Sequence, residues 1–182
     1  LGKRILTIGA GNIGYLTSYQ AMQAGAEVVA IVEAMDHEGG FPVQANRVRR
    51  LGIPIITSHT LLKAIPNEDH TGVVGAVIAE CKNFQPVPGT ERIIKDIDLI
   101  NICTGLIPDN LILEKGKQTF GLHTYGIGDA TRVGEGTCAV LRGKQAAFEI
   151  AQEMHVRFNY DDYLAVSKDY ADSQQHPVRV LD

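Results

Sequence analysis

Three glycines near the start of the chain, Gly9, Gly11 and Gly14, have the spacing G-x-G-x-x-G within the stretch "RILTIGAGNIGYLTSYQ". In a strand-turn-helix unit, the first glycine permits a tight turn, the second lets the backbone approach a pyrophosphate, and the third lets the helix pack close to the sheet. The N–H groups that open such a helix stabilise an anion by roughly 0.3–1 kcal/mol. We therefore predict that Gly9, Gly11, Asn12, Ile13 and Gly14 form a dinucleotide site; the alternative is a purely structural turn.

Glu33 follows the next predicted strand, residues 27–32, at the position that distinguishes the two nicotinamide cofactors. A carboxylate there accepts hydrogen bonds from both ribose hydroxyls of the adenosine and repels a 2′-phosphate. The nearest arginines along the chain are Arg47, Arg49 and Arg50. We therefore predict NAD rather than NADP, and the alternative is that Glu33 is only a solvated strand end. A methyltransferase also combines a glycine-rich turn with an acidic strand end, but it usually lacks a second dinucleotide-type motif.

The elements that position these residues follow from the hydrophobic pattern. The first third of the chain predicts the order β-α-β-α-β, with strands at 5–8, 27–32 and 53–60 and helices at 12–24 and 43–51. Two β-rich segments, 72–82 and 90–96, predict a small antiparallel excursion, and 97–105 predicts a further buried strand. This order is typical of a dinucleotide-binding half-fold.

The second half of the chain predicts a strand that reaches another glycine-flanked turn, at 122–130. A long alanine-rich helix is predicted at 135–154, and a further helix at 160–170 in a polar tail. We expect three regions, with a Rossmann-like domain at 1–115, a strand and helix of a second domain at 116–156, and the tail at 157–182.

Two segments of this second half, "NICTGLIPD" and "YGIGDATRVGEGTCAVLRGKQAA", resemble the two-dinucleotide-binding flavoproteins of the pyridine nucleotide-disulfide oxidoreductase superfamily. The resemblance implies that Gly105, in a T-G-x-x-P segment, ends the NAD domain. It also implies that Asp129, which follows Gly128, contacts the ribitol of FAD, and that Gly136 and Thr137 open a helix that points towards the flavin. The implied fold is an α/β, Rossmann-like parallel sheet with a small antiparallel insertion, followed by a partial second dinucleotide-binding domain.

Within that superfamily the chain is most similar to the FAD- and NAD-binding subunits of sarcosine oxidase (alpha), opine oxidase, hydrogen cyanide synthase and dye-linked proline dehydrogenase. "AGAEVVAIVEA" and "GIPIITSHTLLKA" carry this similarity. The group implies hydride transfer between nicotinamide and flavin, so we name no catalytic acid, base or nucleophile. A complete member has an earlier glycine-rich motif for FAD in addition to the one for NAD, whereas this sequence has a single G-x-G-x-x-G motif, which we assign to NAD. We therefore expect a fragment, inactive alone, that is completed by a missing FAD-domain half or a partner subunit.

The composition of the chain argues against several other classes of function. The net charge of −4 argues against nucleic acid, and no run of about 18 apolar residues indicates a membrane span. Cys81, Cys103 and Cys138 are widely separated, which is typical of a reducing, cytoplasmic location. The six histidines lack metal-ligand spacing, so we predict no metal. An apolar face left by a missing half predicts a homo-oligomer. A non-catalytic structural or assembly module with an empty dinucleotide turn is the alternative function.

Overall fold

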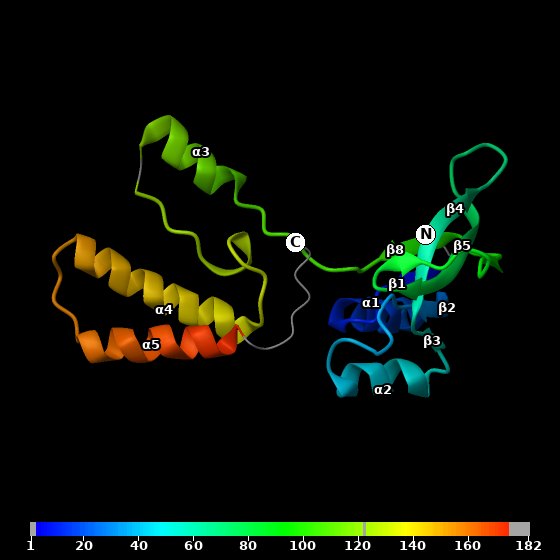
Figure 1. The fold of residues 1–182 in the computed structure, drawn as a ribbon, viewed down its shortest axis with the longest axis horizontal. Helices are drawn as coiled ribbons and strands as arrows, with labels where there is room; N and C mark the ends of the chain where they lie inside the picture. The colour runs from blue at the N-terminus through cyan, green and yellow to red at the C-terminus, as the bar shows by residue number, and fades with distance from the viewer. Residues whose placement is uncertain (1–2, 122, 175–182) are drawn as a thin grey trace. The chain divides into compact units, whose positions relative to one another are not determined.

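The computed structural model describes residues 3–121 and 123–174, which form two compact units (Figure 1). Unit 1 comprises Leu1–Gly105 and unit 2 comprises Leu106–Asp182. The domain limits expected from the sequence, at residues 115 and 156, stay predictions.

A four-stranded parallel sheet forms the centre of unit 1. Its strands are ordered β3-β2-β1-β8, with β1 at Arg4–Ile8, β2 at Glu27–Val32, β3 at Ile55–Ile56 and β8 at Leu99–Ile102. All strands therefore end at the same edge, where β1 leads into the glycine-rich turn and β2 leads into Glu33. This arrangement confirms the predicted Rossmann-like α/β class.

Alternation along β1 explains why the sheet is covered on both faces. Ile5 packs in a core with residues of helices α1 (Asn12–Gln23) and α2 (Pro42–Arg50). Leu6 and Ile8 pack on the opposite face, together with Ala76 and Ile78 of strand β5. Since successive side chains of a strand point to opposite faces, a strand that is buried on both sides is apolar throughout. In unit 1, Figure 1 shows α1 and α2 on one side of the sheet and β4 and β5 on the other.

The antiparallel insertion is larger than the sequence predicted. It contains β4 (His59–Pro66), β5 (Val73–Lys82), β6 (Gln85–Pro86) and β7 (Arg92–Lys95), with β5 paired to the other three. The prediction of one strand over 53–60 was wrong. Ser58 has a positive φ of 53°, and the chain turns there from β3 in the parallel sheet to β4 in the antiparallel one. Antiparallel pairing with β5, the next strand along the chain, determines the extent of β4.

The helices described in unit 2 are joined by irregular segments. Unit 2 contains α3 (Leu111–Phe120), the short 3-10 helix η1 (Gly128–Ala130), α4 (Gly136–Glu153) and α5 (Tyr160–Ser173). The predicted strand over 122–130 was wrong for residues 123–127, which are irregular, and Leu122 lies outside the described residues. No other strand of unit 2 is described that could pair with this segment, and an unpaired strand is not stable in water.

Helices α4 and α5 lie side by side (Figure 1) and are joined by an aromatic cluster. The ring of Phe148 lies 5.2 Å from that of Phe158 and 5.9 Å from that of Tyr163. Asn159 caps α5, because its side chain accepts a hydrogen bond from the N–H of Asp161 at 3.0 Å. The predicted helices over 135–154 and 160–170 are therefore confirmed.

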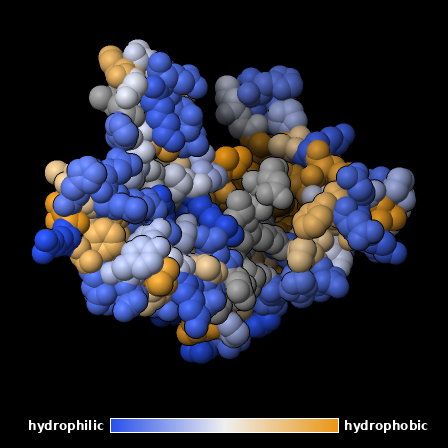
Figure 2. Space-filling model, turned by 60° about the vertical axis from the view of Figure 1, so that its left-hand side comes forward, coloured by the Kyte–Doolittle hydropathy of each residue, from blue (hydrophilic) through white to orange (hydrophobic). Residues whose placement is uncertain are grey.

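On the face shown in Figure 2, apolar side chains interrupt a largely hydrophilic surface. In unit 2, Ile107, Ile112 and Phe120 are 73%, 89% and 70% exposed. Exposed apolar surface of this kind is common at interfaces, and the expected homo-oligomer stays a prediction. No helix in the described part of the chain is both long and apolar enough to cross a membrane.

Candidate functional site

The glycine-rich turn has the geometry that its spacing predicts. Gly9 has a φ of +106°, and a Cβ there would lie 2.2 Å from the carbonyl oxygen of Cys103. A Cβ on Gly14 would lie 2.0 Å from the carbonyl oxygen of Gly9, so only glycine lets α1 approach the turn this closely. By contrast, a Cβ on Gly11 would meet no atom within 4 Å of it. Gly11 therefore borders open space, whereas the other two glycines are enclosed.

The start of α1 lies at this open position. Gly11 is the N-cap residue and has no side chain to cap the helix, and Asn12 and Ile13 begin the first turn. The first N–H groups of a helix carry a partial positive charge and bind anions. An open approach to a glycine N-cap suits a pyrophosphate, so the residues present fit the dinucleotide that the motif predicts.

Glu33 is turned into the protein beneath the glycine-rich turn. Its side chain is 1% exposed. The N–H of Ala10, inside the turn, donates to Oε2 of Glu33 at 2.8 Å, and the N–H of Met35 donates to Oε1 at 2.9 Å. The carboxylate thus connects the end of β2 to the turn that follows β1. It is not the solvated strand end of the alternative interpretation.

The loop after β2, residues 34–41, packs directly on the glycine-rich turn. The N–H of Phe41 donates to Oδ1 of Asn12 at 2.8 Å. A Cβ on Gly40 would lie 2.7 Å from the backbone nitrogen of Asn12, and one on Gly39 would lie 3.4 Å from the carbonyl oxygen of Ala10. The two glycines in "HEGGFP" therefore allow a close approach between two loops at the carboxyl edge of the sheet.

This loop, α2 and the end of β3 enclose a cavity of about 480 Å³. Its lining includes the charged residues Asp36, His37, Glu38 and Arg49. Arg49 forms an ion pair with Glu38, and the hydroxyl of Tyr15 on α1 donates to Oε2 of Glu38 at 3.2 Å. Burial and the Glu38 carboxylate raise the pKa of Tyr15 well above its usual value. In open α/β sheets, ligands bind at this edge, so the cavity extends the candidate site.

Sequence reasoning missed these cavity residues. It noted only that Arg47, Arg49 and Arg50 are the arginines nearest to Glu33 along the chain, and it gave them no role in the site. The fold brings Arg49 back to the loop that follows Glu33. Arg47 has a different role, since its guanidinium lies 5.6 Å from the centre of the Tyr19 ring. The adjacent glycines in "HEGGFP" were the one signal of a close backbone contact.

The other candidate residues lie on both units. Gly105, with a φ of +137°, follows β8 at the end of unit 1. In unit 2, Gly128 and Asp129 form part of η1, and Gly136 and Thr137 open α4. Oδ1 of Asp129 accepts a hydrogen bond from the N–H of Gly134 at 3.2 Å. Asp129 itself is exposed at the surface of unit 2.

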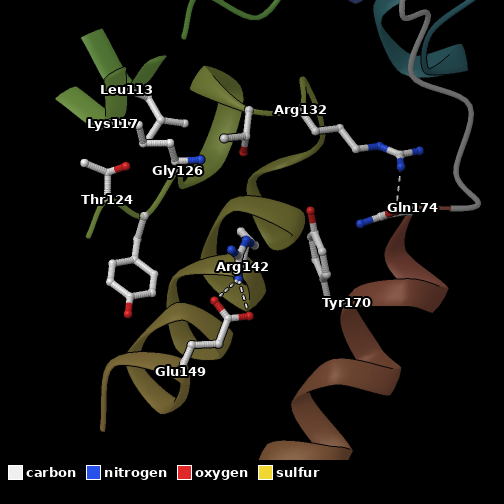
Figure 3. Close-up of a pocket in the computed structure, with 11 residues that line it drawn as sticks. Leu113, Lys117, Thr124, Gly126, Arg132, Arg142, Glu149, Tyr170 and Gln174 are labelled. Atoms are coloured by element: carbon white, nitrogen blue, oxygen red, sulfur yellow. Dashed lines mark hydrogen bonds and ion pairs between the residues drawn. The ribbon is translucent and has the colours of Figure 1, made fainter. Parts of the chain in front are cut away.

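Unit 2 also contains a cavity of about 510 Å³, between α3, α4 and α5 (Figure 3). Nη1 of Arg142 donates to both oxygens of Glu149, at 3.0 and 3.1 Å, and Arg132 donates to Gln174 at 2.6 Å. The cavity is lined by Leu113, Lys117, Thr124, Tyr125, Gly126, Thr131, Arg132, Arg142, Glu149, Tyr170 and Gln174. The candidate flavin contacts are not among these described lining residues.

The cysteines take part in packing. Cys81 and Cys138 are buried, and all three cysteines are free. Sγ of Cys138 lies 3.1 Å from the hydroxyl of Ser173, which joins the start of α4 to the end of α5. Within residues 3–121 and 123–174, no three His, Cys, Asp or Glu side chains form a group that could hold a metal ion.

The fold and the glycine-rich turn define unit 1 as a dinucleotide-binding α/β domain. The chain belongs to the pyridine nucleotide-disulphide oxidoreductase family, whose model matches residues 1–131. The family implies FAD and a pyridine nucleotide as cofactors. A search of curated proteins found no match.

The solved structure of a thioredoxin reductase shows the same fold. Thioredoxin reductase from T. acidophilum is 24% identical, with a TM-score of 0.52, over 62% of this chain and 34% of that protein. A NAD-dependent persulfide reductase from A. fulgidus is 25% identical, with a TM-score of 0.45, over 63% of this chain and 20% of that protein. The chain thus spans about a third of the length of the thioredoxin reductase that it matches.

Proposed function

We propose that unit 1 binds NAD(H), in preference to NADP(H), as part of an FAD-dependent oxidoreductase. The observation that carries this proposal is the contrast among the three glycines. Gly9 and Gly14 are enclosed by backbone, whereas Gly11 borders open space at the start of α1. A turn with a purely structural role has no need for the open glycine, but a pyrophosphate does.

The residues of this chain would bind and orient the cofactor. The N–H groups of Gly11, Asn12 and Ile13 would hold the pyrophosphate, and Glu33 would keep the turn in place from below. When bound, the nicotinamide supplies hydride chemistry, which in this family is exchanged with a flavin. The protein therefore needs no acid or base of its own for that step.

The finer assignments are also proposals. Gly105 would end the NAD-binding part, and Gly128, Asp129, Gly136 and Thr137 would contact FAD once the rest of an FAD domain, or a partner subunit, completes the site. The oxidation of amino acids or similar amines, as in the sarcosine oxidase alpha, opine oxidase, hydrogen cyanide synthase and proline dehydrogenase group, is the proposed setting. The proposed location is the cytoplasm.

The test replaces Gly11 by valine in the full chain. The variant should fold, because the position is open and has an extended backbone with φ −96°. The side chain would occupy the approach of the pyrophosphate, so NADH affinity should fall by more than about tenfold, the equivalent of one charge-assisted hydrogen bond. Ala24→Val is the matched control, since it adds a similar volume at the exposed opposite end of α1.

NADH fluorescence titration measures the binding, and circular dichroism checks the fold. Wild-type binding that Gly11→Val retains would refute the site. A wild-type chain that binds no NADH would favour a structural or assembly module. A visible absorption spectrum of the same sample tests the flavin part, because a flavin band would show that the elements around Asp129 suffice to bind FAD.

A further inference from the structure

The strongest feature outside the glycine-rich turn is the charged cavity that the 34–41 loop forms with α2. Its position relates it to the cofactor, because Gly39 and Gly40 line it and also contact the glycine-rich turn. Thr57, which directly follows β3, lines the other side. The cavity thus lies at the carboxyl ends of β2 and β3, next to the start of α1, where the adenosine half of a dinucleotide binds in this class of fold.

We propose that Glu38 determines cofactor choice at this cavity by holding Arg49 in an ion pair, so that the guanidinium is unavailable to the 2′-phosphate of NADP. This inference rests on the proposed function, because it concerns the adenosine end of the same cofactor. It assigns the discrimination to Glu38, five residues beyond the carboxylate at the strand end. The ligand class that the cavity accepts is therefore an adenosine ribose with a free 2′-hydroxyl.

The contacts of Arg49 support this assignment. Its Nη2 is paired with Oε1 of Glu38, and its Nη1 donates to Oδ1 of Asn46 at 3.0 Å. Half of the Arg49 side chain is nevertheless exposed, compared with a quarter of that of Glu38. The guanidinium is thus accessible from the cavity, and it would become a phosphate-binding group if its carboxylate partner were removed.

The charged groups that line the cavity also disfavour a phosphate. Asp36 and Glu38 supply two carboxylates against the single guanidinium of Arg49, with His37 beside them. A hydrogen bond with the His37 ring, at 2.6 Å, lowers the pKa of the Asp36 carboxyl. The Asp36 carboxylate thus adds to the negative charge of the cavity, where a 2′-phosphate would meet more carboxylate than guanidinium groups.

Glu33 cannot make the same contribution in this arrangement, because its carboxylate is buried against the backbone of Ala10 and Met35. Glu38 is fixed in place by a second contact, the hydroxyl of Tyr15 at 3.2 Å. The side chain that discriminates is thus held from both α1 and α2. These two contacts give the Glu38 carboxylate a defined orientation although the residue lies in a loop.

The experiment replaces Glu38 by glutamine in the full chain and titrates NADH and NADPH at low ionic strength. The ratio of the two dissociation constants, NADPH over NADH, should fall by about tenfold, since the released Arg49 gains a charge-assisted contact with phosphate. Adding Arg49→Gln to this variant should restore the wild-type ratio. Glu27→Gln is the matched control, because it breaks another Arg–Glu pair of unit 1, with Arg4, at the opposite end of β2.

Three results would overturn the inference. The first is an equal ratio in Glu38→Gln and Glu27→Gln, and the second is a wild-type chain that prefers NADPH. The third is a wild-type chain that binds neither cofactor. This result also refutes the proposed function, whereas the first two leave the binding of a nicotinamide cofactor intact. If Glu38→Gln does not fold, the salt dependence of cofactor binding by the wild-type chain tests the inference instead. Added salt should then narrow its preference for NADH, because salt screens repulsion, and a salt-independent preference would refute the charge mechanism.

Discussion

Replacing Glu33 by glutamine tests whether this carboxylate holds the glycine-rich turn. Glutamine keeps one oxygen but puts an N–H2 group in place of the other, so one of the N–H groups of Ala10 and Met35 would lose its acceptor and face a donor. A hydrogen bond to a charged group contributes about 1.5–3 kcal/mol, and a buried N–H without an acceptor costs a similar amount. We expect the free energy of unfolding to fall by about 2–4 kcal/mol.

Two measurements check this expectation. Urea denaturation followed by circular dichroism gives the change in stability, and hydrogen exchange of the peptide that contains Ala10 reports on the turn locally. Glu27→Gln is the control, because that side chain is 56% exposed and its surface ion pair should contribute at most about 1 kcal/mol.

The reasoning would be refuted if Glu33→Gln matched the control in stability and in exchange at Ala10. Loss of NADH affinity with unchanged stability would instead assign Glu33 to the ribose hydroxyls, as the sequence predicts. The two roles of this carboxylate are thus separable by one variant and its control.

Two further predictions concern the two units in turn. Gly9→Ala should destabilise unit 1 by roughly 2–4 kcal/mol, because the new Cβ would combine a φ of +106° with a clash against the carbonyl of Cys103. Gly136→Ala is the control and should be neutral or slightly stabilising, since Gly136 lies on a helix and borders open space. Thermal denaturation compares the two variants. In unit 2, the adjacent Glu153 carboxylate raises the pKa of Tyr125 to about 12. The unfolded chain then releases this proton near pH 10, before the folded chain does, so wild-type stability should fall between pH 10 and about 12, and Tyr125→Phe should lose less stability over that range.

The local elements of unit 1 were largely predictable because their signals are local. The apolar run of β1, the glycine spacing and the glycine that follows α1 (Gly25, with a φ of +89°) lie within one stretch of chain. The observed β1, α1 and β2 agree with the predicted ranges. Gly9 and Gly14 needed no structural information, since each glycine's role follows from its place in the motif.

The strand predictions that failed depended on partners elsewhere in the chain. Residues 53–60 divide between two sheets because β3 pairs with β2 while β4 pairs with β5. The segment 123–127 has strand-like composition and is irregular, and the longer elements described in its unit are helices. A strand is stabilised by the strands beside it, and no local pattern specifies those neighbours.

The sequence by itself determined the class of fold, the glycine-rich turn and the family, because glycine spacing and hydrophobic period are properties of short segments. Only the tertiary structure decided which charges meet. It buried Glu33 beneath the turn and brought Arg49, which is distant from the end of β2 along the chain, into an ion pair with Glu38. Electrostatic interactions act through space and not along the sequence, so the side chains that we propose to discriminate between cofactors come together only when the loops and α2 have packed.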